Sequence, residues 1–118
     1  MVMRVKLKKG AAANEKIRGW LKEEKIYEVL TIEQYCSDSA GYRIESEDSS
    51  QPVVFETSYF DIVETSIPGS WIVLGVAGAT IELGPPCFGQ KDFWERFFDR
   101  EPEALEMYES ERKKMKQQ

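Results

Sequence analysis

The first ninety residues of this chain are built of short segments rich in β-branched and aromatic residues, separated by turn residues. In the first segment, Met3, Val5 and Leu7 alternate with basic residues, which is the two-residue period of a half-buried strand. Residues 10–25 give a mixed signal, and we expect a loop with a possible helical turn there. The expected strands are residues 3–8, 25–36, 41–46, 53–56, 71–76 and 79–83.

Two of these segments carry more detailed predictions. Residues 25–36 alternate well enough to predict one long strand with a possible bulge. Residues 58–60 predict a tight turn or one turn of 3-10 helix. This turn should deliver Phe60, Ile62 and Val63 to the core.

The C-terminal region has the signature of two helices. Asp92 can cap a first helix, and Pro102 occupies a suitable first position for a second helix over about residues 102–116. Glutamates near the start of this second helix and basic residues near its end match the helix dipole. Aromatic residues recur on one face of the first helix, and a face this apolar should be buried. The aromatic cluster consists of Phe88, Phe93, Trp94, Phe97 and Phe98.

Together these patterns predict a mainly β fold of the α+β class. With 118 residues, 42% of them hydrophobic, the chain can bury about two thirds of its unfolded surface in one core. We expect one domain over residues 1–118, with a β-barrel region at 1–90 and a helical extension at 91–118. The barrel would be small and antiparallel, with about five to six strands, and the two C-terminal helices would cover its open side.

A resemblance to a known class of proteins rests on four stretches: KIYEVL, GYRIES, VVFETSYFDIVETSIPGSW and FWERFFDREPEALEMYE. The first three resemble the SH3-like barrels of small bacterial proteins, in which a strand pair is followed by a 3-10 turn and a short strand. The fourth looks like the tail that follows such barrels. Some of these proteins are similar to immunity proteins that neutralise secreted toxins. The resemblance implies a fold and a class of function, and it carries over no functional residue.

Charge is segregated along the sequence. Residues 1–25 carry eight Lys or Arg against three Asp or Glu, whereas residues 26–90 carry only Arg43 against ten acids. Residues 91–118 carry seven against eight, and the net charge of the chain is −5. An acidic middle would repel nucleic acid and anionic lipid and attract a basic protein surface.

The acidic middle also contains the candidate binding residues. Acidic side chains on two neighbouring connections would form a rim around two tyrosines, a residue type enriched at interface hot spots. Such a surface fits a basic protein partner, while the alternative is an ordinary solvated face that keeps exposed strands from pairing. The candidate partner-binding residues are Tyr42, Glu45, Glu47, Asp48, Glu56, Tyr59, Asp61 and Glu64.

Catalytic and metal-binding patterns are missing from the sequence. There is no histidine, no nucleophile motif and no phosphate-binding loop, so we expect no enzyme activity, no cofactor and no metal. Cys36 and Cys87 lie far apart without a CxxC pattern, and we expect both to be reduced, although sequence leaves a bridge between them open. The longest apolar run is too short for a membrane span, and residues 1–20 lack a secretory signal, so we expect a cytoplasmic protein.

The sequence therefore favours a non-enzymatic binding protein, an immunity or antitoxin-type inhibitor whose acidic barrel covers a basic toxin. It would be a monomer or homodimer, without membrane contact. A first alternative is a structural or phage-associated adaptor that assembles through the aromatic C-terminal helices. A second is a nucleic-acid-associated barrel that uses its basic ends.

Overall fold

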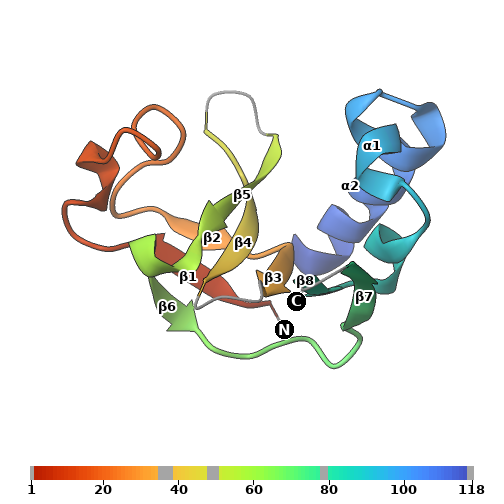
Figure 1. Ribbon diagram of the computed structural model, residues 1–118, viewed down its shortest axis with the longest axis horizontal. Coiled ribbons are helices and arrows are strands. Elements are labelled where there is room, and N and C mark those ends of the chain that lie inside the picture. The colour runs from red at the N-terminus through yellow and green to blue at the C-terminus, as the bar shows by residue number, and fades with distance from the viewer. Residues whose placement is uncertain (1, 35–38, 48–50, 78–79, 117–118) are drawn as a thin grey trace.

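The computed structural model describes residues 2–34, 39–47, 51–77 and 80–116. Within these residues the strands form two antiparallel sheets, one of three strands and one of five (Figure 1). The smaller sheet has the order β2-β1-β6, and the larger has the order β5-β4-β3-β8-β7. The strands are β1 (Arg4–Leu7), β2 (Ile26–Glu28), β3 (Thr31–Gln34), β4 (Ala40–Glu45), β5 (Pro52–Glu56), β6 (Phe60–Glu64), β7 (Ile72–Ala77) and β8 (Thr80–Gly84).

The predicted long strand at residues 25–36 is wrong in one respect, because the chain changes sheets in its middle. Val29 donates its backbone N–H to Met3, beside the smaller sheet, at 2.9 Å, and Leu30 donates to Arg43 of the larger sheet at 2.9 Å. Neither Val29 nor Leu30 is exposed to solvent. The expected bulge is therefore a buried corner between β2 and β3, and it ties the two sheets together.

The larger sheet separates two cores, as the alternation along β4 makes plain. Tyr42 and Ile44 face the smaller sheet, whereas Arg43 stacks on Trp94 and Glu45 bonds to the C-terminal helix. We call the first group the sheet core: Met3, Val5, Leu7, Ile17, Leu21, Tyr27, Val29, Tyr42, Ile44, Phe55 and Phe60. We call the second group the helix core: Val2, Leu30, Phe88, Phe93, Phe97, Ala104, Tyr108 and Met115.

The helices largely follow the prediction. Helix α2 (Pro102–Lys116) begins at the expected proline, with an acidic residue in its first turn and lysines in its last. Helix α1 (Phe93–Phe98) follows a 3-10 turn, η3 (Pro86–Gly89). Asp92 does precede α1, but it has a left-handed backbone (φ 56°) and its side chain makes no capping hydrogen bond, so the predicted cap is wrong.

Burial corrects two details of the predicted core. Phe98 is 46% exposed, whereas Phe88, Phe93 and Phe97 are buried and Trp94 is partly buried. The expected 3-10 turn is present as η2 (Thr57–Tyr59) and Phe60 is buried, but Ile62 and Val63 are exposed. The reason is that β6 is an end strand of the smaller sheet, where side chains have neighbours on one side only.

The N-terminal segment between β1 and β2 is mostly irregular. It begins with a short 3-10 turn, η1 (Ala11–Ala13), and then buries Ile17 and Leu21 in the sheet core. It lies at the opposite end of the molecule from α1 and α2 (Figure 1).

The predicted fold class is confirmed at the level of a mainly β, α+β protein with two C-terminal helices. The closed barrel is not: among the described residues neither sheet closes on itself, and there are eight strands where about five to six were expected. Strands β2 and β6 end the smaller sheet and strands β5 and β7 end the larger one, and between described residues none of these four pairs with another of them. No helix in the described part of the chain is long and apolar enough to span a membrane.

Candidate functional site

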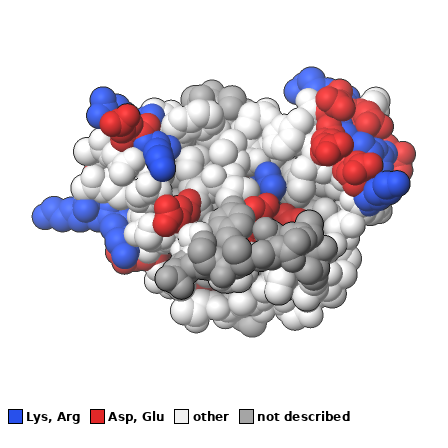
Figure 2. Space-filling view, in the orientation of Figure 1, with Lys and Arg blue, Asp and Glu red and all other residues white. Residues whose placement is uncertain are grey.

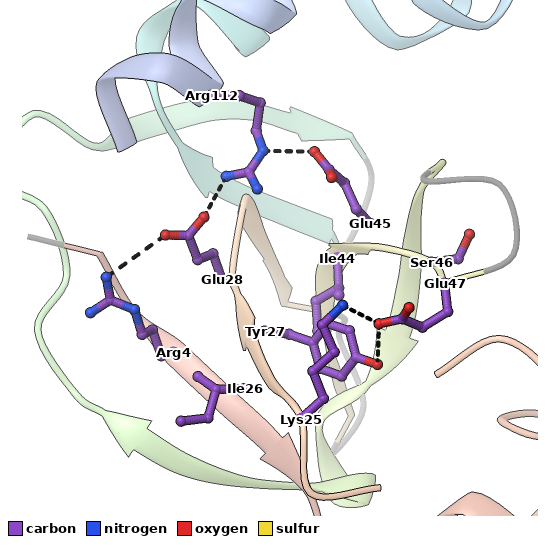
Figure 3. Close-up of a pocket in the computed structure, with 10 residues that line it drawn as sticks. All are labelled: Arg4, Lys25, Ile26, Tyr27, Glu28, Ile44, Glu45, Ser46, Glu47 and Arg112. Atoms are coloured by element: carbon purple, nitrogen blue, oxygen red, sulfur yellow. Dashed lines mark hydrogen bonds and ion pairs between the residues drawn. The ribbon is translucent and has the colours of Figure 1, made fainter. Parts of the chain in front are cut away.

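A pocket lies where the two sheets meet helix α2, and we call it the junction pocket (Figure 3). It has a volume of about 490 Å³ and is open to solvent. Four parts of the chain contribute to it: β1, strand β2 with the residue before it, the end of β4 with the two residues after it, and helix α2. Its lining residues are Arg4, Lys25, Ile26, Tyr27, Glu28, Ile44, Glu45, Ser46, Glu47 and Arg112.

On the α2 side, Arg112 joins two carboxylates from different strands. Its Nη1 lies 2.9 Å from Glu28 Oε1 and its Nε lies 2.6 Å from Glu45 Oε1. Tyr108 donates its hydroxyl to the same Glu45 oxygen at 2.5 Å. Burial acts to lower the pKa of Arg112, but the two carboxylates outweigh it and the pKa is raised. Arg112 therefore stays charged and holds Glu28 and Glu45 in place.

On the opposite side, Glu47 is held by Lys25 and Tyr27. The Lys25 ammonium pairs with Glu47 Oε1, and Tyr27 donates its hydroxyl to the same oxygen at 3.1 Å. The hydrogen bond from Lys25 lowers the pKa of Glu47, whereas burial raises the pKa of Tyr27 to about 12. Near pH 7 Glu47 is thus ionised and Tyr27 is neutral. Neither group is poised to transfer a proton at that pH, so this arrangement is suited to binding.

The cations of the pocket differ in how firmly they are held. The side chain of Arg112 is 12% exposed, whereas Lys25 is 50% exposed. Arg4 is 35% exposed, and its Nη2 lies 3.8 Å from Glu28 Oε2. Exposed pairs of this kind contribute only about 0–1 kcal/mol each. Lys25 and Arg4 can therefore move away from their carboxylates at little cost.

Only part of the predicted acidic rim gathers at this pocket. Glu45 and Glu47 line it, whereas Glu56 and Asp61 are exposed elsewhere. Glu64 accepts hydrogen bonds from the backbone and hydroxyl of Ser66, at 3.3 and 3.0 Å. Asp48 lies outside the described residues.

The two predicted aromatic anchors have different environments. Tyr42 is only 7% exposed and packs edge-on against Phe60 in the sheet core, so its assignment as a surface anchor is wrong. It is buried because it shares a face of β4 with Ile44. Tyr59 is half-buried and lines a different pocket, beside β5.

Part of the charge segregation seen in the sequence is neutralised by ion pairs within the fold. Carboxylates of the acidic middle pair with cations from both ends of the chain: Glu28 with Arg4 and Arg112, Glu45 with Arg112, and Glu47 with Lys25. In the view of Figure 2, charges of both signs gather at the two ends of the molecule, and the described residues between them are mostly uncharged. The described part of the middle segment therefore presents no continuous acidic surface on this face.

The sequence reasoning missed the residues that complete the pocket. The sequence places Arg112 among basic residues that match the helix dipole or could contact nucleic acid, and it predicts that Arg4 faces solvent or pairs with a neighbouring copy. It gives no role in a site to Lys25, Tyr27 or Glu28. The available signal was the charge balance itself, because an acidic middle between basic ends predicts internal pairing as well as attraction of a partner.

A second polar cluster lies between the larger sheet and α1. Arg43 bonds to Glu33 at 3.2 Å and stacks on the Trp94 ring, 4.1 Å from its centroid. Among the described residues, Thr31 Oγ1, Glu82 Oε2 and Trp94 Nε1 are buried without a hydrogen bond of standard geometry. Burial raises the pKa of Glu82, although the charge of Arg43 acts against it. None of these residues lines the junction pocket, and we treat the cluster as part of the helix-side packing.

Cys87 does not act as a reactive thiol in this environment. It donates its S–H to Glu111 Oε1 at 3.3 Å, and burial raises its pKa to about 12. Cys36 lies outside the described residues, so the expected absence of a bridge stays a prediction. The described parts of the chain also contain no group of three or more His, Cys, Asp or Glu residues that could hold a metal ion.

Comparisons of this chain with protein-family models, with curated proteins and with solved structures find no match.

Proposed function

We propose that this protein is a non-enzymatic inhibitor of the immunity or antitoxin type, with a fold related to SH3-like barrels, that covers a basic surface of a toxin. The observation that carries the proposal is the junction pocket, where three carboxylates from β2 and the end of β4 meet in one open cavity. Two of them, Glu45 and Glu47, belong to the acidic rim expected from the sequence.

The pocket is arranged so that a cationic side chain of a partner can replace Lys25 or Arg4. Arg112 and Tyr108 fix Glu45, and Arg112 also fixes Glu28, so both carboxylates are positioned before a partner arrives. Lys25 and Arg4 are exposed and can be replaced by an arginine or lysine from the partner. An incoming arginine would gain a charge-assisted, bidentate hydrogen bond, which the single lysine ammonium cannot provide. Such binding would block a toxin by occlusion and would weaken as salt increases.

The alternatives receive less support. Most of the aromatic residues that an adaptor would use for assembly are packed inside the helix core, and Phe98 alone among those five is largely exposed. The lysines at the end of α2 remain available to nucleic acid, but their position is the one expected from the helix dipole.

The test is a capture experiment at low and moderate salt, with the tagged protein and two charge-reversed variants. Glu47→Lys changes the pocket without removing the Arg112 anchor, and Glu109→Lys is the matched control on the exposed surface of α2. We expect the wild-type protein to retain one basic protein at low salt and to lose it as salt rises. Glu47→Lys should weaken that binding at least about tenfold, and Glu109→Lys should leave it nearly unchanged.

The captured protein is then purified, and its toxicity or activity is measured with and without the wild-type protein. Loss of activity at equimolar ratio supports the inhibitor. Equal binding by Glu47→Lys, or a captured protein that keeps its full activity in the complex, would contradict it.

A further inference from the structure

The formal charges that line the junction pocket cancel. Its lining contains three cations and three carboxylates, which are Arg4, Lys25, Arg112, Glu28, Glu45 and Glu47. A basic side chain that enters this pocket alone leaves it with a surplus of positive charge, and the cations already present oppose its binding. The pocket therefore favours a ligand that brings a negative charge together with its positive charge.

The longest ion pair of the pocket shows where such a ligand can enter. Arg112 donates to both Glu28 and Glu45, so these three side chains together carry one positive and two negative charges. Arg4 supplies the balancing charge, but its Nη2 lies 3.8 Å from Glu28 Oε2, which is too long for a hydrogen bond. The side chain of Arg4 is also 35% exposed, against 12% for Arg112. An incoming guanidinium can therefore replace Arg4 and bond to Glu28, which Arg112 keeps in position.

The outer face of the smaller sheet offers a surface for the rest of that side chain. Tyr27 packs in the sheet core, so its neighbours Ile26 and Glu28 lie on the opposite face of β2. Ile26 is 51% exposed and lines the same pocket, between Arg4 and Lys25 in the view of Figure 3. The methylene groups of an arginine can pack on Ile26 while its guanidinium bonds to Glu28.

We propose that the junction pocket binds an arginine of the inhibited protein together with a carboxylate next to it, as one neutral unit. The guanidinium replaces Arg4 beside Glu28, and the released Arg4 pairs with the incoming carboxylate. One ion pair within the protein is thus exchanged for two with the partner, and each charge keeps a counter-charge. The carboxylate is that of a C-terminal arginine or that of an adjacent acidic side chain. The inference rests on the proposed function, because it names what the basic partner presents to the same pocket.

The first test uses small probes and the protein alone at low salt. Nα-acetyl-arginine carries a guanidinium and a carboxylate, whereas its amide carries the guanidinium only. Nα-acetyl-citrulline carries the carboxylate without the positive charge. A blocked arginine–aspartate dipeptide places the carboxylate on the adjacent side chain instead of at the chain end. Dissociation constants are measured from the amide chemical shifts of residues 26–28 and 44–47.

A probe with both charges should bind about fivefold more tightly than the amide. It should bind at least about tenfold more tightly than acetyl-citrulline, which lacks the charge-assisted bonds to the carboxylates. Acetyl-arginine shows the preference over the amide if the carboxylate is that of a chain end, and the dipeptide shows it if the carboxylate belongs to an adjacent side chain.

Two variants on β1 test the role of Arg4. Arg4→Met should reverse the preference, so that the amide binds more tightly, because the pocket then lacks the cation that receives the carboxylate. Lys6→Met should preserve the preference, since Lys6 is exposed on the same strand and does not line the junction pocket. The proposal is overturned if the amide binds as tightly as both probes that carry two charges, if Arg4→Met leaves the preference unchanged, or if no probe shifts these amides at about 10 mM.

The second test separates this inference from the proposed function. If a basic partner is captured and inhibited, Arg4→Met should weaken its binding, and the preferred probe should compete with it. Unchanged or tighter capture by Arg4→Met, without competition by either probe that carries two charges, would overturn the neutral unit and leave the inhibitor standing. Probe binding with the expected preference, but with no partner inhibited, would support the neutral unit as the ligand and contradict the inhibitor.

Discussion

The two faces of the larger sheet are packed in different ways, although they share the same strands. On one face, Tyr42 and Ile44 of β4 join a core built from aliphatic and aromatic side chains. On the other face, Arg43 and Glu45 of the same strand reach into the layer of helices. The sheet core thus depends mainly on burial of apolar area, whereas the helix side combines an aromatic core with fixed charges.

This difference explains how the C-terminal helices are held. Tyr108 lies in helix α2. Its ring packs in the helix core, and its hydroxyl donates a hydrogen bond to Glu45. One turn further along, Arg112 bonds to Glu28 of the smaller sheet and Glu45 of the larger sheet. The polar contacts fix the position of a helix that apolar packing alone would leave free to slide, and they also form one wall of the junction pocket.

The largest effect is expected from emptying the centre of the helix core with Phe88→Ala. The ring of Phe88 lies 5.0 Å from Trp94, 5.2 Å from Phe93 and 5.8 Å from Tyr108, measured between centroids. Removing it should lower the free energy of unfolding by about 3–5 kcal/mol, which is typical for a buried phenylalanine. Urea unfolding followed by far-UV and near-UV circular dichroism measures the loss.

The same experiment tests whether the two cores form one cooperative unit. Because both cores pack on the same five-stranded sheet, we expect the two spectroscopic signals to change together in a single transition. Phe60→Ala in the sheet core is the matched variant. Separate transitions, with the sheet intact after the helices have unfolded, would contradict the expected single domain.

A smaller loss is expected when the charged anchor of α2 is removed by Arg112→Met. This variant keeps the apolar stem of the side chain but leaves Glu28 and Glu45 without their shared cation. We expect a loss of about 2–3 kcal/mol, below the usual range for a fully buried pair because the carboxylates keep some contact with water. The free energy of unfolding at pH 7 provides the measurement.

Arg4→Met is the control for that variant, because Arg4 contacts the same Glu28 from a more exposed position at 3.8 Å. It should change the stability by less than about 0.5 kcal/mol. A loss from Arg112→Met as small as the loss from Arg4→Met would mean that α2 is held by packing alone and that the contrast between the two sides of the sheet is overstated.

The local features of the fold were predictable, and the long-range ones were not. The period of β1, the 3-10 turn before Phe60 and the proline at the start of α2 are signals read within a few residues. The corner at Val29 and Leu30 leaves no such signal, since each residue is buried and bonds to a different sheet. Sheet order and the absence of closure depend on pairings between distant strands, which local alternation does not encode.

The candidate site illustrates the same limit. Arg112 is 84 residues from Glu28 and 67 from Glu45, so no motif or spacing connects them. Charge composition indicated that acidic and basic segments would attract something, but it did not distinguish an external partner from the chain's own ends. The prediction for Tyr42 failed for a different reason, because Tyr42 and Ile44 alternate with Arg43 and Glu45, and this local pattern already favours the apolar face for Tyr42.

The smallest change in the free energy of unfolding is expected from Glu82→Gln on the helix side of the sheet, and this change should be a gain and not a loss. Burial raises the pKa of Glu82 in the folded protein above its ordinary value of 4.5. At a pH between the ordinary pKa and the folded pKa, the folded protein therefore binds more protons than the unfolded chain. The stability contributed by this group is therefore fully present below about pH 4.5 and falls as pH rises through the folded pKa. Glutamine removes that penalty and should stabilise the protein at pH 7 by at most about 1 kcal/mol, because solvent screens the partly exposed carboxylate.

The matched control is Glu33→Gln, which alters the residue paired with Glu82 across β3 and β8. Glu33 bonds to Arg43 at 3.2 Å, so its neutralisation should destabilise the protein at pH 7. Thermal unfolding at pH 4 and pH 7 compares the variants with the wild-type protein. The gain from Glu82→Gln should be larger at pH 7 than at pH 4, because at pH 4 the wild-type carboxyl is already protonated. If Glu82→Gln destabilised the protein at pH 7, the attraction between Glu82 and Arg43 would outweigh the cost of burying the carboxylate. The helix side of the sheet would then depend on its charges even more than the anchor at Arg112 indicates.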